Sequence, residues 1–350
     1  MDLPCGTFHE NYAQDMAVIR TGKQWGALVI FLILLIAYPF FVSDSLLSIG
    51  IVIGITVVSV HGLNILTGYC GQISMGHAAF MAVGGYVSGI LCARFGWSFF
   101  AALPFAGLCA GLVGLFFGLP SLRIKGFYLI MATVAAQFIV IWVILQLYSI
   151  TGGPEGLPVP RPEIAGMVLK SKASYFYMVM IFAVLATIVA KNLVRTRVGR
   201  AFIAIRDNDL AAEVMGINVF GYKLLAFFIG CVFAGVAGSL LVHYVTFAFP
   251  AQFPFLDSVW YLGMLIAGGM GSISGGIFGV VALKLLDYAV TLAGPAASGI
   301  FPALSGPAGA AVGLFIRGLV IILFLIYEPR GLINRWELIK AYFRLWPYSR

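Results

Sequence analysis

Ten apolar stretches occupy most of the chain and leave few folds open to it. Hydrophobic residues make up 61% of the sequence and charged residues only 10%. A helix needs about 20 apolar residues to cross a bilayer, and only helices and closed barrels satisfy their backbone polar groups in lipid. The sequence therefore predicts an all-α polytopic membrane protein. The apolar segments are residues 25–42, 46–66, 77–93, 98–119, 127–148, 174–190, 223–245, 257–268, 276–292 and 309–327.

The number of crossings depends on the eighth segment. Residues 257–268 are too few to span a bilayer alone and are interpreted as half of a broken helix, which gives eight to ten crossings. The first segment follows a polar stretch and has no small-residue cleavage site nearby, so we expect a retained span rather than a removed signal peptide. The predicted organisation is a cytoplasmic segment 1–24, a transmembrane domain 25–327 and a cytoplasmic tail 328–350.

Lysine and arginine residues are distributed unevenly between the loops. With the N-terminus inside, most of them fall on the cytoplasmic side, and the outer side receives Arg94, Arg161, Lys170 and Lys172. The positive-inside rule then places both termini and the loop 191–222 in the cytoplasm, and the loop 149–173 outside. The net charge of +8 thus reflects orientation in a membrane. Because the sequence has no polybasic run, it does not predict nucleic-acid binding.

A nine-residue pattern, G-x-x-G-x-I-S-x-G, occurs twice, at residues 68–76 and 268–276. Each copy interrupts an apolar stretch, and matched glycine-interrupted segments mark the binding region of many transporters. Close helix packing is the simpler explanation for any one glycine. Both copies fall on the inner side in this topology, so whether the repeat is parallel or inverted stays open. The residues expected near a translocation pathway are Gly68, Gly71, Gln72, Ser74, Gly76, His77, Gly268, Gly271, Ser272 and Ser274.

Two loops carry recognisable local structure. In the inner loop, Asn208 and Asp209 precede an Ala-Ala-Glu run, which predicts a short helix with its acids at the positive end of the helix dipole. Gly216 is predicted to end this helix. On helix physics alone, it could equally be a solvated connector. The outer loop contains residues typical of tight turns, namely Thr151, Gly152, Gly153, Pro154 and Glu155.

The sequence lacks the motifs of several kinds of site. It has no G-x-x-x-x-G-K-[ST] motif, so the chain is not expected to bind ATP in a P-loop. The four histidines have no partner at metal-ligand spacing, and the five cysteines are isolated from one another. No cluster of histidine, cysteine or acidic residues is suited to catalysis. We therefore expect no cofactor, no metal and no enzymatic activity in this chain.

The inner-loop helix carries a motif of its own. The residues Leu210-Ala211-Ala212 and, four positions later, Gly216 resemble the E-A-A-x-x-x-G motif of ABC importer permeases. In that family the motif forms the coupling helix, which docks on the ATP-hydrolysing subunit. Leu210 stands where the family has glutamate, so the docking contacts are expected to differ. The resemblance implies ATPase-coupling roles for Asp209, Leu210, Ala211, Ala212, Glu213 and Gly216.

Further motifs occur along most of the chain, including L-N-I-L-T-G-Y at 63–69, L-R-I-K-G-F-Y at 122–128 and P-R-G-L at 329–332. The most specific stretch is 197–218. Together they resemble the LivM-type permeases of branched-chain amino-acid ABC importers. The resemblance implies a multi-pass subunit of a bacterial-type inner membrane that moves branched-chain or other apolar amino acids. The partners it implies are a second membrane permease subunit, two ATP-binding cassette ATPase subunits that bind the ATP, an extracytoplasmic substrate-binding protein and membrane lipid.

Several alternatives stay open. Relatives of the same architecture move urea or short amides, so the resemblance does not fix the substrate. A self-sufficient channel or an ion-coupled carrier would also fit the glycine repeat, but ion coupling usually needs buried acids. Asp287 is the one acid deep within an apolar segment, and the basic Lys284 lies three residues before it. A membrane-embedded enzyme is the least favoured class, for want of a catalytic cluster.

Overall fold

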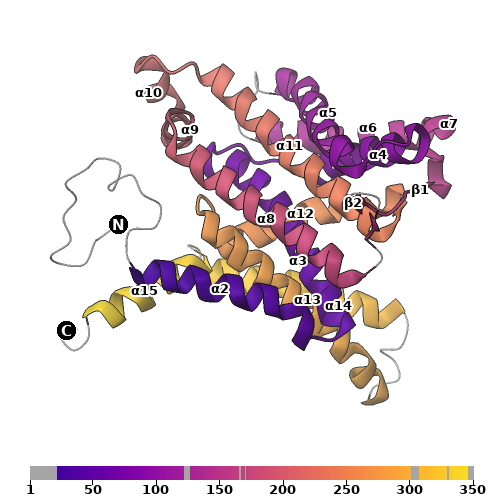
Figure 1. Ribbon diagram of the computed structural model, residues 1–350. Helices are drawn as coiled ribbons and strands as arrows, with labels where there is room; N and C mark the ends of the chain where they lie inside the picture. Colours follow the sequence, from indigo (N-terminus) through magenta and orange to yellow (C-terminus); the bar gives the residue numbers. More distant parts are fainter. Residues whose placement is uncertain are drawn as a thin grey trace. The chain divides into compact units, whose positions relative to one another are not determined.

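The described chain is almost entirely helical (Figure 1). The computed structural model describes residues 22–121, 127–164, 167–169, 171–300, 307–328 and 331–345. Its helices are α2 (Gly22–Phe41), α3 (Asp44–Leu63), α4 (His77–Phe95), α5 (Phe99–Ser121), α6 (Phe127–Gln146), α7 (Tyr148–Thr151), α8 (Lys172–Arg195), α9 (Arg197–Asp207), α10 (Asp209–Val214), α11 (Val219–Val245), α12 (Phe255–Gly268), α13 (Ile273–Ile300), α14 (Pro307–Tyr327) and α15 (Leu332–Leu345). A π-helix, η1 (Asn64–Tyr69), continues α3, and two 3-10 turns are η2 (Gly153–Glu155) and η3 (Pro250–Gln252). The chain forms two units, residues 1–47 and 48–350, and the second holds every element from α4 onward.

Each predicted apolar segment is helical in the structure. Two shorter apolar stretches, Leu28–Phe41 and Ala311–Leu323, lie within α2 and α14. α12 has 14 residues and is too short to cross a bilayer alone, as expected for residues 257–268. The prediction of an all-α polytopic membrane protein is confirmed. Among the described residues, seven helical stretches are long and apolar enough to cross a membrane: Asp44–Tyr69, His77–Phe95, Phe99–Leu119, Tyr128–Gln146, Lys172–Arg195, Val219–Val245 and Ile273–Leu292.

Local hydrogen bonds and glycines explain where several helices begin and end. The Ser171 hydroxyl accepts a hydrogen bond from the amide of Ala173 at 3.3 Å and starts α8. The Asn218 side chain accepts one from the amide of Gly221 at 3.0 Å and starts α11. α4 ends at Gly96, which has a left-handed φ of 65°.

The helices α4, α5 and α11 pack against one another more extensively than any others in the second unit (Figure 1). Between α4 and α11, Gly84 lies against Gly235, and Gly238 lies against the backbone of Met81. A Cβ atom at Gly84 would lie 2.6 Å from the carbonyl carbon of Gly235, and one at Gly238 would lie 2.6 Å from that of Met81. Small residues allow helix backbones to approach this closely in membranes, where packing drives association.

Short strands anchor the loop 149–173, which is predicted to face outward. β1 (Leu157–Pro158) pairs antiparallel with β4 (Phe247–Ala248), and β2 (Glu163–Ile164) pairs antiparallel with β3 (Met167–Val168). β4 belongs to the connection between α11 and α12. The β1–β4 pair therefore joins the loop 149–173 to a connection almost ninety residues further along the chain.

The inner loop 191–222 contains two helices, and the expectation of a single short helix was incomplete. α8 extends to Arg195, and α9 follows directly after Thr196, whose hydroxyl accepts a hydrogen bond from the Gly199 amide at 3.4 Å. The side chains of Phe202 and Ile205 are buried on one face of α9. This i, i+3 spacing of apolar residues, together with the capping threonine, is the signal from which α9 follows.

Candidate functional site

The first glycine repeat begins in the π-helix η1 and continues as a turn. The amide of Cys70 donates to the carbonyl of Ile65 at 3.2 Å, and the amide of Gln72 donates to the carbonyl of Leu66 at 3.1 Å. Gly71 has a φ of 73°, which is in the left-handed region that glycine adopts readily. π-helical turns within longer helices are frequent at functional sites. The interruption predicted from the sequence is therefore present at this copy.

The second repeat connects α12 to α13 and shares one backbone feature with the first. Gly271 has a φ of 75°, close to that of Gly71 at the equivalent position. The Ser272 hydroxyl accepts a hydrogen bond from the Gly275 amide at 3.2 Å and so caps α13. A Cβ atom at Gly268 would lie 2.8 Å from the carbonyl carbon of Gly275, so the turn is tightly closed. The two copies thus share a left-handed glycine at their fourth position, but the next helix begins within the second copy, at residue 273, and only after the first copy, at residue 77.

The structure brings the two copies into direct contact through Asn64. Its side-chain oxygen accepts a hydrogen bond from the Gly271 amide at 3.0 Å, and its side-chain amide donates to the Ser272 carbonyl at 2.9 Å. Asn64 is fully buried. A Cβ atom at Gly68 would lie 2.5 Å from the Gly271 nitrogen, so the contact needs glycine there. We call this contact, made by residues 64–72 and 268–272, the repeat junction.

Arg206, at the end of α9, lies at the repeat junction. Its Nη1 donates to the carbonyl of Gly68 at 3.1 Å. A Cβ atom at Gly71 would lie 3.1 Å from the Arg206 Cγ, and one at Gly271 would lie 2.9 Å from its Nη1. The Nε and Nη2 atoms bind Asp207 Oδ1 at 3.0 and 2.9 Å, which orients the guanidinium. Both repeat copies therefore lie at the end of the second unit that carries the loop 191–222.

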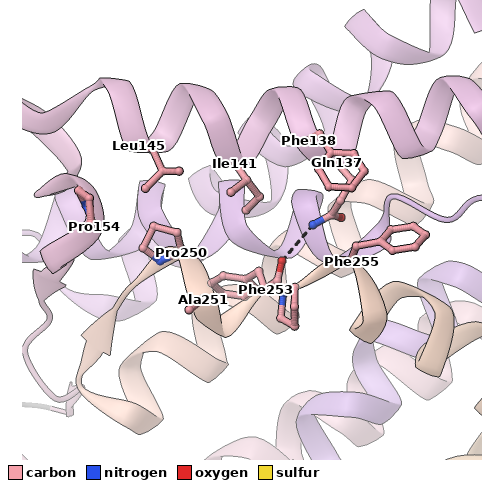
Figure 2. Close-up of a pocket in the computed structure, with 10 residues that line it drawn as sticks. Gln137, Phe138, Ile141, Leu145, Pro154, Pro250, Ala251, Phe253 and Phe255 are labelled. Carbon is pink, nitrogen blue, oxygen red and sulfur yellow. Dashed lines mark hydrogen bonds between the residues drawn. The ribbon is translucent and has the colours of Figure 1, made fainter.

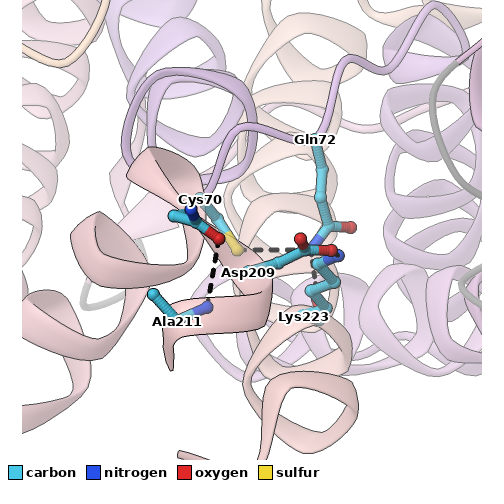
Figure 3. Close-up of polar contacts among 6 residues, drawn as sticks. Cys70, Gln72, Asp209, Ala211 and Lys223 are labelled. Carbon is cyan, nitrogen blue, oxygen red and sulfur yellow. Dashed lines mark hydrogen bonds and ion pairs between the residues drawn. The ribbon is translucent and has the colours of Figure 1, made fainter. Parts of the chain in front are cut away.

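A second set of polar contacts joins α10 to the first repeat (Figure 3). The Gln72 side-chain amide donates to the Lys223 carbonyl at 3.0 Å and to the Cys70 sulfur at 3.3 Å. The Lys223 ammonium lies 3.5 Å from Asp209 Oδ2. Burial raises the pKa of the Cys70 thiol to about 11, against smaller opposing effects of Gln72 and Lys223, so the thiol stays protonated at neutral pH. The contacts run from the inner-loop helix through α11 to residue 72.

The ends of α10 match the sequence prediction. The Asn208 side chain accepts a hydrogen bond from the Ala211 amide at 3.0 Å, which caps the start of the helix. Gly216 has a φ of 82°, and its amide donates to the Glu213 carbonyl at 2.9 Å. The amide of the following residue donates to the Ala212 carbonyl at 3.0 Å. These two bonds form a Schellman motif, so Gly216 ends the helix as predicted.

The helix α10 exposes apolar side chains on its surface. Ala212 is buried, whereas Leu210 is 63% exposed, Val214 88% and Met215 81%. Leu210 and Val214 are four residues apart and therefore share one face. We call Leu210, Val214 and Met215 the α10 apolar surface. Ala211 and Glu213 are exposed beside it.

Replacing Gly216 by alanine is expected to destabilise α10 by about 1–2 kcal/mol, because a side chain at positive φ is strained. No other residue crowds the position, since a Cβ atom there would have no neighbour within 4 Å among the described residues. Gly216→Asn, which tolerates this φ better, should lose less. Amide hydrogen exchange over residues 209–217 measures the effect. Equal exchange in both variants would contradict the strain argument.

Three predicted pathway residues are packed into the protein interior. Nε2 of His77 lies 3.0 Å from a backbone carbonyl of α3, and the side chain is 1% exposed. A Cβ atom at Gly76 would lie 3.1 Å from the carbonyl carbon of Thr133. Ser74 is buried, and its hydroxyl has no hydrogen-bond partner within the described part of the chain. Ser274 differs from these three, since it is exposed beside the repeat junction.

The outer-loop motif forms the tight turns that its residues indicate. The Thr151 hydroxyl donates to a carbonyl in α6 at 2.7 Å and accepts from the Gly153 amide at 3.1 Å. Gly152 and Gly153 both have positive φ angles, 76° and 58°. Glu155 accepts a hydrogen bond from the Tyr148 hydroxyl at 3.4 Å. The motif therefore fastens the end of α6 to the outer loop.

A mostly apolar pocket of about 410 Å³ lies beside this loop (Figure 2). Residues of α6, including Gln137, Phe138 and Ile141, line it together with Pro154 and with residues 250–251 and 253–255. The Gln137 side-chain amide donates to the carbonyl of Phe253 at 3.0 Å. None of the predicted pathway residues lines this pocket. The pocket and the repeat junction are therefore separate features.

The described residues offer no group of three or more His, Cys, Asp or Glu that could hold a metal ion. Cys70, Cys92, Cys109 and Cys231 are all free thiols. His61 and His243 contact hydroxyl groups, with Nε2 atoms 2.9 Å from Thr187 Oγ1 and 2.7 Å from Ser88 Oγ. These histidines therefore serve helix packing. The absence of a metal or cofactor in the whole chain stays a prediction.

Comparison with known proteins places the chain among transport proteins. The family profile described as "branched-chain amino acid transport system / permease component" matches residues 44–325. The high-affinity branched-chain amino acid transport system permease protein LivM of Escherichia coli is 33% identical over 276 residues, which are 72% of this chain and 65% of that protein. The chain thus covers less than two thirds of this relative. No solved structure matches.

Two relatives of lower identity are also named as permease proteins. The probable branched-chain amino acid transport permease protein LivM of Methanocaldococcus jannaschii is 25% identical over 236 residues, 66% of this chain and 67% of that protein. The autoinducer 2 import system permease protein LsrC of Yersinia enterocolitica is 28% identical over 189 residues, 52% of this chain and 48% of that protein.

Proposed function

Since the chain belongs to the family of permease components of branched-chain amino acid transport systems, we propose that it is the membrane permease subunit of an ABC importer. In this proposal it moves branched-chain or other apolar amino acids across the membrane, and ATP hydrolysis in separate subunits drives the movement. The observation that carries the proposal is the set of contacts between the inner-loop helices and the repeat junction. They join the helices α9 and α10 to the two repeat copies.

The α10 apolar surface is the proposed docking site for an ATPase subunit. Leu210, Val214 and Met215 belong to the segment 191–222, which connects the apolar helices α8 and α11, and not to a membrane-spanning stretch. Large apolar side chains gathered on an exposed surface are typical of protein–protein contacts. Leu210 takes the position at which the family motif has glutamate, so the proposed contact is more apolar than the motif implies. Asp209 faces inward to Lys223 and is proposed to hold α10 in place rather than to dock.

The proposed movement starts at α10 and reaches the repeats. Docked ATPase subunits that close on ATP would displace α10, and the contact of Asp209 with Lys223 would pass the displacement to α11. Gln72 binds the Lys223 carbonyl, so the first repeat would shift with it. Interrupted helices lend themselves to such changes, because their turns can adjust without unwinding a whole helix. The predicted pathway residues of the segments 68–77 and 268–274 would border the pathway. His77 would contribute by holding α4 against α3 through its contact with a backbone carbonyl.

The partners and orientation belong to the same proposal. They are a second permease subunit, two ATP-binding cassette ATPase subunits and an extracytoplasmic binding protein, with ATP bound only by the ATPases. The chain itself is proposed to catalyse no reaction. The multi-pass helices support a location in the inner membrane. Both termini are proposed to be cytoplasmic on the positive-inside rule, with the turns of residues 151–155 facing the binding protein.

The substrate is proposed from the relatives. Two of them are named for branched-chain amino acid transport, and LsrC is named for autoinducer 2 import, so the family fold serves different substrates. Urea or short amides are the alternative in the same transporter class. Competition of unlabelled leucine, urea and acetamide against radiolabelled leucine in whole cells separates these possibilities. Leucine alone should compete if the proposal is correct.

The decisive experiment is reconstitution with and without partner subunits. The tagged chain is purified from its native membrane in mild detergent, and co-purifying proteins are identified by mass spectrometry. We expect a second permease and P-loop ATPases, and uptake of leucine into liposomes only when these proteins, the binding protein and internal ATP are present. Uptake by the chain alone would contradict the proposal and would instead indicate a channel or a carrier.

A further inference from the structure

The repeat junction contains a contact that the coupling-helix motif does not include. Arg206 belongs to α9, not α10, yet its Nη1 binds the carbonyl of Gly68 at 3.1 Å. On the other side of Gly68, Asn64 binds both the Gly271 amide and the Ser272 carbonyl. A charged side chain from the inner loop therefore ends at the point where both repeat copies meet.

We propose that Arg206 is a positioning residue that, together with Asn64, makes both repeat copies move as one piece with α9. This inference rests on the proposed function, because it needs a loop that ATPase subunits displace. It adds a second connection to the one through Lys223, and this connection reaches the second repeat as well as the first. The geometry supports it at three points.

The first point is the carbonyl that Arg206 binds. Gly68 lies near the end of the π-helix η1, where backbone carbonyls lose their partners within the helix. A guanidinium that binds such a carbonyl compensates the negative end of the helix dipole. Movement of Arg206 away from Gly68 would leave this carbonyl unsatisfied. Separation of the helix end from α9 would therefore cost free energy, and the two elements are expected to move together.

The second point is the way Arg206 is held. Asp207 binds the Nε and Nη2 atoms, which leaves Nη1 directed at Gly68. This arrangement fixes the plane of the guanidinium, and a single ammonium group could not reproduce both contacts. Arg206 thus makes directed contacts to both Asp207 and Gly68. An arginine needed only for membrane orientation would not require such contacts.

The third point is the coupling between the copies. Asn64 uses its one side-chain amide group to bind two successive residues of the second copy, and it follows α3 at the start of η1. Gly68 has no room for a side chain, so the two backbones stay in contact. A displacement of Gly68 would therefore carry residues 271–272 with it. The repeats act as one piece, and Arg206 is the group that connects this piece to α9.

Arg206→Ala in the reconstituted complex tests the inference, with Arg200→Ala as the matched control. Arg200 lies on the same helix and is exposed, and its Nη1 binds the Arg195 carbonyl within the inner loop. We expect Arg206→Ala to assemble with the ATPases and hydrolyse ATP at the wild-type rate, but to transport about tenfold less substrate per ATP, within the usual range of coupling between sites. Arg200→Ala should match the wild type. Equal transport per ATP in the two variants would overturn the inference.

Amide hydrogen exchange gives a second readout that does not depend on transport. Arg206→Ala should speed exchange in peptides covering both 68–76 and 268–276, although Arg206 belongs to neither. Faster exchange in the first copy alone would show that Arg206 does not act on both repeats, and would also overturn the inference. If Arg206→Ala does not fold, Asp207→Asn keeps Arg206 but loosens its orientation and should give a smaller change of the same kind. A wild-type complex without ATP-driven uptake would contradict the proposed function instead, and the exchange result would still stand.

Discussion

Gly238→Val is expected to disrupt the packing of α4 against α11 and to cause a large loss of stability. A Cβ atom there would lie 2.6 Å from the carbonyl carbon of Met81 and 2.8 Å from its Cα. The obstacle is helix backbone, which cannot rotate away as a flexible side chain could. Overpacking in a well-packed interior typically costs about 1–3 kcal/mol, and more where the backbone must shift. α4 also carries Gly84, which lies against Gly235, so the shift would separate a second close contact.

Expression of the variant as a fluorescent fusion, followed by size-exclusion chromatography in mild detergent, measures the effect. We expect little or no monodisperse Gly238→Val protein and a large fall in its apparent unfolding temperature. Gly313→Ala is the matched control, because it also adds a side chain within a membrane helix. Among the described residues, its Cβ atom would meet Val290 Cγ1 at 3.5 Å, an ordinary contact. A Gly238→Val protein as abundant and as heat-stable as Gly313→Ala would show that α4 and α11 do not approach as described.

The sequence allowed the helices and local turns to be predicted because their causes are local. Apolar segments of sufficient length are expected to be helical in lipid, and each segment is helical in the structure, although α13 continues to Ile300, past the predicted end at residue 292. The cap at Asn208 and the left-handed Gly216 depend only on residues within one or two turns. The repeat was visible for the same reason, since a left-handed residue at the same position of each turn favours glycine, as Gly71 and Gly271 illustrate.

The contacts that make the candidate site could not be predicted, because they join residues far apart along the chain. Arg206 and Arg200 lie on the same helix, and although Asp207 follows Arg206, nothing in the local sequence indicates that Arg206 binds Gly68. Asn64 offered a weak signal as a polar residue within an apolar run, where such residues need partners. Its partners lie more than 200 residues away. The sequence also indicated His77 as a pathway residue, but polarity alone does not separate a lining residue from one that hydrogen-bonds a buried carbonyl.

A glutamate at Val214 is expected to uncouple ATP hydrolysis from transport while leaving the fold intact. Val214 is 88% exposed, the most of the three residues of the α10 apolar surface, so the change removes little internal packing. A charge placed in an apolar contact must lose its water without gaining a partner, which commonly costs about 2 kcal/mol or more at the centre of an interface. That corresponds to roughly 30-fold weaker docking. Glutamate is a good helix former, so α10 itself should persist.

The amount of ATPase that co-purifies with the variant, and its ATP-driven uptake in liposomes, measure this effect together. Both should fall at least tenfold, whereas Val214→Ile, which keeps an apolar side chain at the same site, should retain both. Monodispersity of the isolated chain should be the same in the two variants. Full uptake by Val214→Glu would mean that the ATPase does not dock at Leu210, Val214 and Met215. Loss in Val214→Glu combined with retention in Arg206→Ala would place all coupling in α10 and its contact through Lys223. A third outcome is loss of uptake in both variants, with the ATPase still co-purifying with Arg206→Ala. This result would separate ATPase docking at α10 from transmission of the movement to the repeats. The two residues lie on different helices, and Arg206 contacts Gly68 of the first repeat.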